Sequence, residues 1–188
     1  MPETSFTGSI KINVFVTYQS IQDLWTPTDS LQQEFGTSYT NGFGANQATR
    51  IWNDRRRLNA TSEELDLFGV LSDVYGNTIK FTKIKSISFK NRSTTSRADL
   101  LVGGAAANAW ATMFGHASDK FTVPPNTCYT IDNPMDGYTV TGGTGDKLKV
   151  DAGANDITYD MIIIGNHSTT TSTSTSTSTS TSTSTTSP

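Results

Sequence analysis

Hydrophobic and polar residues alternate along several short segments of the chain, and the clearest example spans residues 9–18. Aliphatic residues occupy every second position there, namely Ile10, Ile12, Val14 and Val16. Because successive side chains of a strand point to opposite faces, this period places the aliphatic side chains on one face. Only Phe15 interrupts the polar face. The pattern predicts an N-terminal β-strand with one apolar face.

The alternation is lost between residues 21 and 33, which we interpret as a linker from an N-terminal arm to the main domain. Pro27 cannot donate a hydrogen bond to a strand ladder and breaks the segment. The next residues, Thr28, Asp29 and Ser30, are all types that cap helices, so they predict a short helical turn. The sequence therefore predicts an arm and linker over residues 1–34 and a main domain over residues 35–166.

Short β-favouring segments separated by turn residues recur along the main domain. We expect strands at residues 48–58, 65–71, 78–91, 100–102, 121–123, 128–131, 138–141, 147–150 and 157–164. The alanine-rich stretch 105–109 is too short for a stable helix, and we expect a loop that enters a strand at Trp110. Spacing of this kind predicts an all-β fold, an antiparallel β-sandwich resembling a jelly roll.

The longest of these segments, residues 78–91, changes its parity twice. Its apolar residues are Ile79, Phe81, Ile84, Ile87 and Phe89, of which only Ile84 has an even number. In a regular strand, Ile84 would point away from the other four side chains. We therefore expect a β-bulge, or two successive strands, at this point.

The C-terminal tail, residues 167–188, differs from the rest of the chain because every residue from 168 to 187 is serine or threonine. Such a composition is typical of a flexible, solvated linker. Between residues 171 and 185, however, threonine and serine alternate strictly. In a strand this period places the threonine methyl groups on one face, which favours pairing of several subunits into a β-structured stalk. Both interpretations of the tail stay open.

Composition excludes several classes of partner. The net charge is −3 and only 16% of residues are charged, which argues against a nucleic-acid partner, because such binding needs clustered Lys and Arg. The one cysteine, Cys128, excludes an intramolecular disulfide, and we expect it to be a buried, inert thiol. The longest apolar run, residues 161–164, is too short to span a bilayer. With no signal-peptide pattern at the start, we expect synthesis in a cytoplasm and no membrane partner.

No group of residues carries the signature of a catalytic, cofactor or metal site. Residues 142–147 (GGTGDK) depart from the P-loop, dinucleotide and calcium β-roll motifs, and they predict a β-turn. The spacing of four possible calcium ligands fits no EF-hand loop, which favours solvated turns at Asp151, Asn155, Asp156 and Asp160. Spacing identifies no partner for His116 or His167. We expect a protein that is not an enzyme and that uses no cofactor.

Contacts with other molecules are the remaining source of function. Arg55, Arg56 and Arg57 form the one basic cluster, and in a strand Arg55 and Arg57 share a face. Both an ordinary solvated strand and a contact between subunits fit this cluster. For Trp25, Trp52 and Trp110, packing in a core or an interface is favoured over stacking on sugars. The candidate interface comprises Arg55, Arg56, Arg57, Trp52, Ile12, Val14 and Val16.

The order of several motifs resembles a group of small virion-associated proteins of tailed bacteriophages. The motifs are NGFGAN (41–46), WNDRR (52–56), LDLFG (65–69), LLVGG (100–104), GGTGD (142–146) and TYDMIIIG (158–165). The resemblance covers residues 37–165, so the arm and the tail fall outside it. It implies a β-sandwich protein of the phage particle, a capsid decoration (cement) protein or head fibre that assembles as a homotrimer.

We therefore expect a structural protein of the virion, made in the host cytoplasm and bound to the capsid surface. Its expected partners are the major capsid protein, other virion proteins and further copies of itself. The arm would add a strand to a neighbour or to the shell. One alternative is a receptor-binding fibre or tail module that recognises host glycans through exposed aromatic residues such as Trp110, Tyr129 or Tyr138. A polysaccharide depolymerase ranks behind both, because the chain lacks the repeats of a β-helix.

Overall fold

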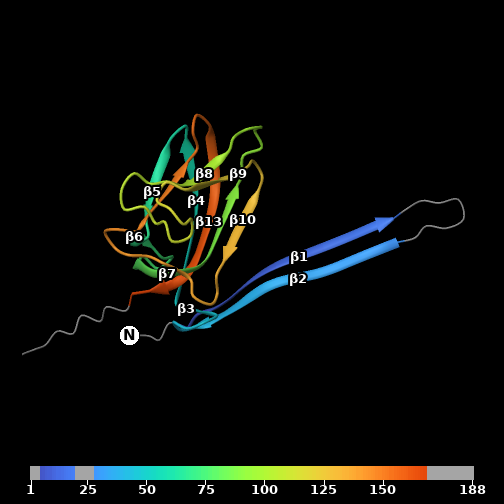
Figure 1. The fold of residues 1–188 in the computed structure, drawn as a ribbon, viewed down its shortest axis with the longest axis horizontal. Helices are drawn as coiled ribbons and strands as arrows, with labels where there is room; N and C mark the ends of the chain where they lie inside the picture. The colour runs from blue at the N-terminus through green and yellow to red at the C-terminus, as the bar shows by residue number, and fades with distance from the viewer. Residues whose placement is uncertain (1–4, 20–27, 169–188) are drawn as a thin grey trace, which may run out of the picture.

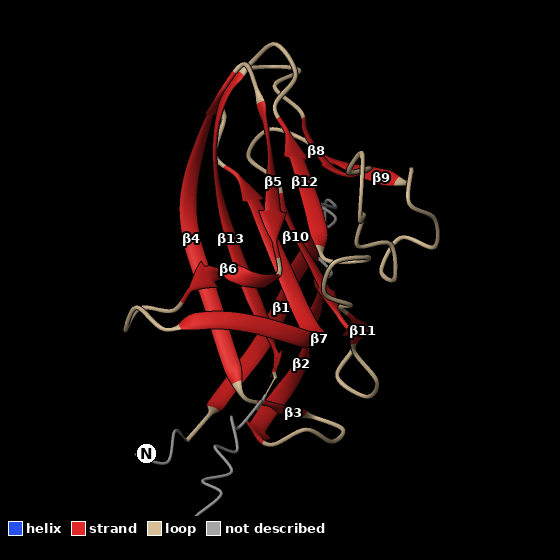
Figure 2. Ribbon diagram, turned by 90° about the vertical axis from the view of Figure 1, so that its left-hand side faces the viewer, coloured by secondary structure: helices blue, strands red, loops and turns tan. Residues whose placement is uncertain are grey.

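The computed structural model describes residues 5–19 and 28–168, and within these ranges the chain forms strands and no helix. The strands assemble into several antiparallel sheets that resemble a sandwich (Figures 1 and 2), which confirms the predicted all-β class. No helix of the described part is long and apolar enough to cross a membrane. Trp25 and the serine/threonine tail beyond residue 168 lie outside the described residues.

Thirteen strands follow one another along the described chain. The first three are β1 (Thr7–Gln19), β2 (Thr28–Asn41) and β3 (Gln47–Ala48). The next five are β4 (Arg50–Asn59), β5 (Ser62–Asp66), β6 (Phe68–Ser72), β7 (Thr78–Asn91) and β8 (Leu100–Gly103). The last five are β9 (Lys120–Val123), β10 (Cys128–Asp132), β11 (Tyr138–Thr139), β12 (Lys147–Asp151) and β13 (Asp156–His167).

Two sheets enclose the core of the body. One has six strands, with β10, β7, β13 and β4 side by side and with β11 and β6 also paired to β7. The other has four strands in the order β5, β12, β8, β9. Alternate side chains of β13, such as Tyr159, Met161 and Ile163, are buried against residues of the second sheet such as Leu148 and Val150. The alternation of apolar and polar residues in the sequence therefore provides the apolar side chains on the inner faces of both sheets.

Strand β7 contains the irregularity that its parity predicted. Its pairing with β13 shifts register twice, between Ile164 and Gly165 and between Asn166 and His167. At each shift β7 has one extra residue, Lys85 in the first case and Thr82 in the second. The bulges turn the strand so that Ile84 is buried in the same core as its odd-numbered neighbours. The predicted bulge is confirmed, and β7 runs through it as one strand.

The arm differs from the prediction because β1 pairs with a second strand of the same chain. The antiparallel register runs from Thr7 opposite Thr40 to Gln19 opposite Thr28. The predicted helical turn at Thr28 is therefore wrong, and β2 continues without interruption through the boundary expected at residue 34. Thr28, Asp29 and Ser30 pair instead with Gln19, Tyr18 and Thr17 of β1. A cap signal read from neighbouring residues alone does not reveal this pairing with a distant strand. We call the pair β1–β2 the ribbon; it extends away from the body (Figure 1).

Two further expectations are corrected by the structure. Residues 105–108 form the expected loop, but Trp110 enters no strand, and Ala109 makes only a single bridge with Lys147. The predicted burial of Cys128 is wrong, because this residue begins β10 with its thiol exposed. Exposure along β10 does not alternate: Cys128 and Tyr129 are exposed, and Thr130 to Asp132 are half-buried. The strand lies at the border of its sheet, where less of the body covers it.

Candidate interaction surface

The two faces of the ribbon differ in polarity. On one face β1 contributes its aliphatic residues, and β2 contributes Leu31 opposite Val16 and Phe35 opposite Ile12. Between these two pairs, the polar Gln33 lies opposite Val14. Five side chains of this face are 49–68% exposed, namely Ile12, Val16, Tyr18, Leu31 and Phe35. The opposite face is polar apart from Phe15. We call the first the apolar face; within the described chain it lies open to solvent beyond the ribbon's root.

The root of the ribbon is fastened to the body. Tyr39 is buried together with Ala48 and Ile164, and Phe6 and Ile10 pack against this small cluster. The hydroxyls of Tyr39 and Thr37 both donate hydrogen bonds to the carboxylate of Asp132, the latter at 2.6 Å. These contacts hold the first part of the ribbon to β10, so the direction in which the ribbon extends is set by packing and hydrogen bonds.

A second root contact lies at the turn after β2. The side-chain amide of Asn166 donates to the carbonyl oxygen of Gly42 at 2.7 Å, and Asn46 donates its backbone N–H to the carbonyl of Pro134 at 2.8 Å. The glycine-rich loop at residues 41–46 joins β2 to β3, and these two strands pair in parallel. It ties the end of β2 to β13 and to the loop after β10.

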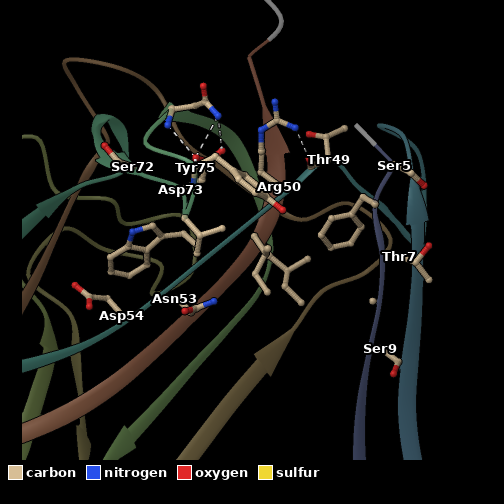
Figure 3. A pocket seen from close by; sticks show the side chains of 17 residues that line it. Ser5, Thr7, Ser9, Thr49, Arg50, Asn53, Asp54, Ser72, Asp73 and Tyr75 are labelled. Atoms are coloured by element: carbon tan, nitrogen blue, oxygen red, sulfur yellow. Dashed lines mark hydrogen bonds between the residues drawn. The ribbon is translucent and has the colours of Figure 1, made fainter. Parts of the chain in front are cut away.

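A groove lies beside the root, between the start of β1, the start of β4 and the turn that joins β6 to β7 (Figure 3). Its volume is about 850 Å³, and Trp52 and Ile164 are among the residues that line it. Burial raises the pKa of Asp73, which lies on the rim of this groove, but hydrogen bonds from Asn77 and Tyr75 outweigh burial and lower that pKa overall. The side-chain amide of Asn77 donates hydrogen bonds to both carboxylate oxygens of Asp73, as the dashed lines in Figure 3 show.

The arginine cluster on β4 is neutralised within the chain. As predicted, Arg55 and Arg57 share the outer face, where Arg55 pairs with Asp160 at 2.7 Å and Arg57 with Asp156 at 3.5 Å. Asp160 also accepts from Arg92 at 2.6 Å. The hydrogen bond and charge of Arg55 hold the pKa of Asp160 below its ordinary value. These pairs make the cluster an internal network and leave little unopposed positive charge for a partner.

Arg56 points the other way, toward the rim of the core. It contacts Glu63 and Asp54, its Nε lying 2.7 Å from Glu63 and its Nη1 2.9 Å from Asp54. The hydrogen bond with Glu63 raises the pKa of Arg56. Glu63 also accepts from the hydroxyl of Tyr159 at 2.7 Å, and burial followed by this bond raises the pKa of Tyr159. The arrangement braces β4, β5 and β13 against one another.

The structure separates the other predicted interface residues into two groups. It brings Ile12, Val14 and Val16 together on the apolar face, with Val14 half-buried. Trp52 lies in the core of the body, away from that face. Sequence reasoning missed Leu31 and Phe35, which continue the face on β2. Leu31, Phe35 and Tyr39 are spaced four positions apart, which places them on one face of a strand. Pro27 and the cap residues that follow it obscured this signal.

Residues considered for chemistry are engaged in ordinary structural contacts. His116 shares a hydrogen bond with Ser118 at 2.9 Å, and His167 accepts from the backbone N–H of Lys80 at 3.0 Å. The described residues contain no group of three or more His, Cys, Asp or Glu placed to hold a metal ion. Asp151, Asp156 and Asp160, expected in solvated turns, lie in strands β12 and β13. Asp156 and Asp160 pair with arginines.

The aromatic residues named for glycan binding are only partly accessible. Trp110 is buried, its indole N–H donates to the carbonyl of Thr139 at 2.8 Å, and its ring packs edge-on against Phe114 and Tyr138. Tyr138 is half-buried and Tyr129 is exposed. Trp110 therefore serves the core, which leaves Tyr129 alone as an open platform among the three.

Comparison of the chain with family models, with curated proteins and with solved structures finds no match. The resemblance to virion proteins of tailed phages stays a prediction, carried by the quoted motifs alone.

Proposed function

We propose that this protein is a structural protein of a tailed-phage particle that binds the outside of the capsid as a homotrimeric decoration (cement) protein or head fibre. In this proposal the body is a jelly-roll-like sandwich, and the partners are the major capsid protein and other copies of the chain. The protein acts through complementary surfaces. No reacting group, cofactor, nucleic acid or membrane takes part.

The observation that carries the proposal is the ribbon with its open apolar face. Large apolar side chains that stay in water forgo roughly 1.5–3 kcal/mol each relative to full burial. A group of them on one face of a projecting element is typical of an interaction surface. The ribbon's root is held firmly by Tyr39 and Thr37, which suits an element that presents a surface to a neighbour.

The strand edges of the molecule support the same function. Strand β4, at one border of the body, carries charged residues at four successive positions, from Asp54 to Arg57. Charged side chains on an edge discourage pairing with other chains. Strand β1 is the outer strand of the ribbon's sheet and carries one charged residue, Lys11. Its edge is thus much less protected, which suits strand addition to a neighbour or to the shell.

Cementing follows from mass action. A protein that binds the assembled shell and not its separate subunits stabilises the shell in proportion to the logarithm of its free concentration over its dissociation constant. Several copies joined in one oligomer bind through several sites at once. Avidity then allows contacts that are individually weak to produce long residence on the particle.

The test uses capsids of the encoding phage assembled without this protein. Purified protein is expected to co-sediment with them in a saturable manner and to raise the temperature at which the shells break. Capsids that already carry a full complement provide the control, because their sites are occupied. Absence of both binding and shell stabilisation would contradict the proposal.

A further inference from the structure

We infer that the apolar faces of ribbons from neighbouring copies of this chain pack against one another, so that the ribbon is the contact that joins the oligomer. This inference rests on the proposed function in one respect, namely that the protein works as an assembly of several copies. It adds the surface through which the copies meet. That surface comprises Ile12, Val16, Tyr18, Leu31 and Phe35.

The outer part of the ribbon lacks the support that the body gives to its root. Near its root, Ile10 and Tyr39 pack on the body. Further out, from the Ile12–Phe35 pair to the Gln19–Thr28 pair, the two strands bond to each other while their large apolar side chains stay exposed. An isolated two-stranded hairpin is marginally stable in water, and it needs a further layer on its hydrophobic face. We therefore expect another surface to cover the apolar face of the outer ribbon.

The apolar face of the ribbon is large enough for a specific contact between copies. Five side chains of this size, each roughly half to two-thirds exposed, offer on the order of 500 Å² of apolar surface. Two such faces together bury about 1,000 Å², which is where specific interfaces begin.

The charges of the ribbon favour a second copy over a charged partner. Among the ribbon's described residues the charged ones are Lys11, Asp29 and Glu34. Lys11 and Glu34 lie on the polar face and pair with each other at 3.0 Å. Asp29 shares the apolar face with Tyr18 but sits in its outermost part, near the end of the pairing. Two identical faces can thus meet without burying a charge at their centre, which avoids a large desolvation cost.

The test compares two variants that remove apolar groups from opposite faces of the same ribbon. Val16→Thr/Leu31→Thr changes the apolar face, while Phe15→Thr removes a large exposed side chain from the polar face. Threonine suits strands, so both variants keep the backbone preference. The masses of wild type and variants are measured by analytical ultracentrifugation over a dilution series. Near-ultraviolet circular dichroism of the buried Trp52 and Trp110 verifies that the body stays folded.

We expect the wild type to form an oligomer whose dissociation constant rises at least about 100-fold in the apolar-face variant, because two buried aliphatic side chains are lost from each copy. The Phe15→Thr variant is expected to retain the wild-type mass. A wild type that is monomeric throughout the series overturns the inference. So does an oligomer that both variants weaken equally, or that neither weakens.

Cross-linking gives a second measurement that does not depend on destabilising the ribbon. Because Cys128 is the one cysteine of the chain, a Cys128→Ser background removes all thiols. In that background, Val16→Cys on the apolar face is expected to form disulfide-linked dimers on mild oxidation. Thr17→Cys on the polar face serves as the matched control. Cross-linking at Thr17→Cys that equals or exceeds that at Val16→Cys contradicts the inference.

Failure of this inference and failure of the proposed function are distinguishable. If the oligomer depends on the apolar face but does not bind capsids, the inference stands and the capsid function falls. If Val16→Thr/Leu31→Thr keeps the wild-type mass but loses capsid binding, the shell covers the apolar face and the inference is overturned.

Discussion

The hydroxyl of Tyr39, in the ribbon, donates a hydrogen bond to the carboxylate of Asp132, at the end of β10 in the body. The two residues are 93 positions apart in the sequence. Their contact lies beside the buried cluster of Tyr39, Ala48 and Ile164. A single buried side chain of β2 thus both packs on the body and bonds to it, which makes it the principal fixing point of the ribbon.

Removal of the Tyr39 hydroxyl is expected to loosen the ribbon. In Tyr39→Phe the ring still packs, but the Asp132 carboxylate loses a buried donor, a change that costs about 1–3 kcal/mol. Thermal or denaturant unfolding measures this loss, and hydrogen exchange is expected to show faster exchange of the β1 and β2 amides. Tyr75→Phe is the control, because Tyr75 is well exposed and lies outside the ribbon. Unchanged exchange in the ribbon of Tyr39→Phe would contradict the assignment.

Ionisation of Tyr39 gives the same contact a pH dependence. Burial, followed by the bond to Asp132, raises the pKa of Tyr39. A tyrosine of the unfolded chain ionises near pH 10. The stabilisation is therefore fully present below about pH 10 and is lost as the pH rises above it. Stability of the wild type is expected to fall more steeply above this pH than that of Tyr39→Phe.

The ion pairs of Asp160 predict the opposite pH dependence. Arg55, assisted by Arg92 and opposed by burial, lowers the pKa of Asp160. Because the folded-state pKa is depressed, the stabilisation is present above the unfolded value of about 4 and is lost as the pH falls through the folded value. Asp160→Asn is expected to lose about 0.5–1 kcal/mol at pH 7, since both arginines are substantially exposed.

The matched control for this network is Asp156→Asn. Asp156 pairs with Arg57 at 3.5 Å, with both side chains well exposed, so its removal is expected to have a smaller effect. Urea unfolding at several pH values measures both variants. A difference between wild type and Asp160→Asn that persists at pH 2 would count against the assigned ion pairs.

Close approach at the β7 bulge makes Gly165 irreplaceable. A Cβ atom at this position would collide with the carbonyl oxygen of Lys83 and press on Phe81 and Ile84. We expect Gly165→Ala to destabilise the protein by about 2 kcal/mol or more, because backbone must move to admit the methyl group. Gly145→Ala is the control, as a Cβ there meets only ordinary contacts at 3.9 Å or more. Equal melting temperatures for the two variants would refute this account of the bulge.

His167 confers acid sensitivity on the end of β13. Burial, with the charges of Arg50 and Lys80, lowers its pKa, and its Nδ1 accepts a hydrogen bond from the Lys80 amide. A depressed folded-state pKa means that stability is present above the unfolded value of about 6.5 and is lost as the pH falls. His167→Gln keeps an acceptor without titrating. Between pH 8 and pH 5 the wild type is therefore expected to lose stability relative to this variant, as measured by urea unfolding.

Local pattern was enough to predict most strands of the body. The parity change at Ile84 predicted the bulge in β7, because a strand has only two faces and Ile84 had to return to the core. Alternation also placed Ile12 and Val16 on one face and Arg55 and Arg57 on another. At residues 28–30 the local pattern gave a wrong prediction. Their side chains are of types that cap helices, but pairing with β1 makes these residues part of a strand.

The sequence by itself determined which segments extend and which side chains share a face, since both follow from the period of two along a strand. Only the tertiary structure decided that β2 pairs with β1, that Trp110 closes the core and that Arg55 is neutralised by Asp160, 105 residues away. It also decided that one face of the ribbon stays uncovered. Strand pairing and the burial of a surface both depend on contacts between residues far apart in the sequence. A local pattern of polar and apolar residues does not specify which distant surfaces will be in contact.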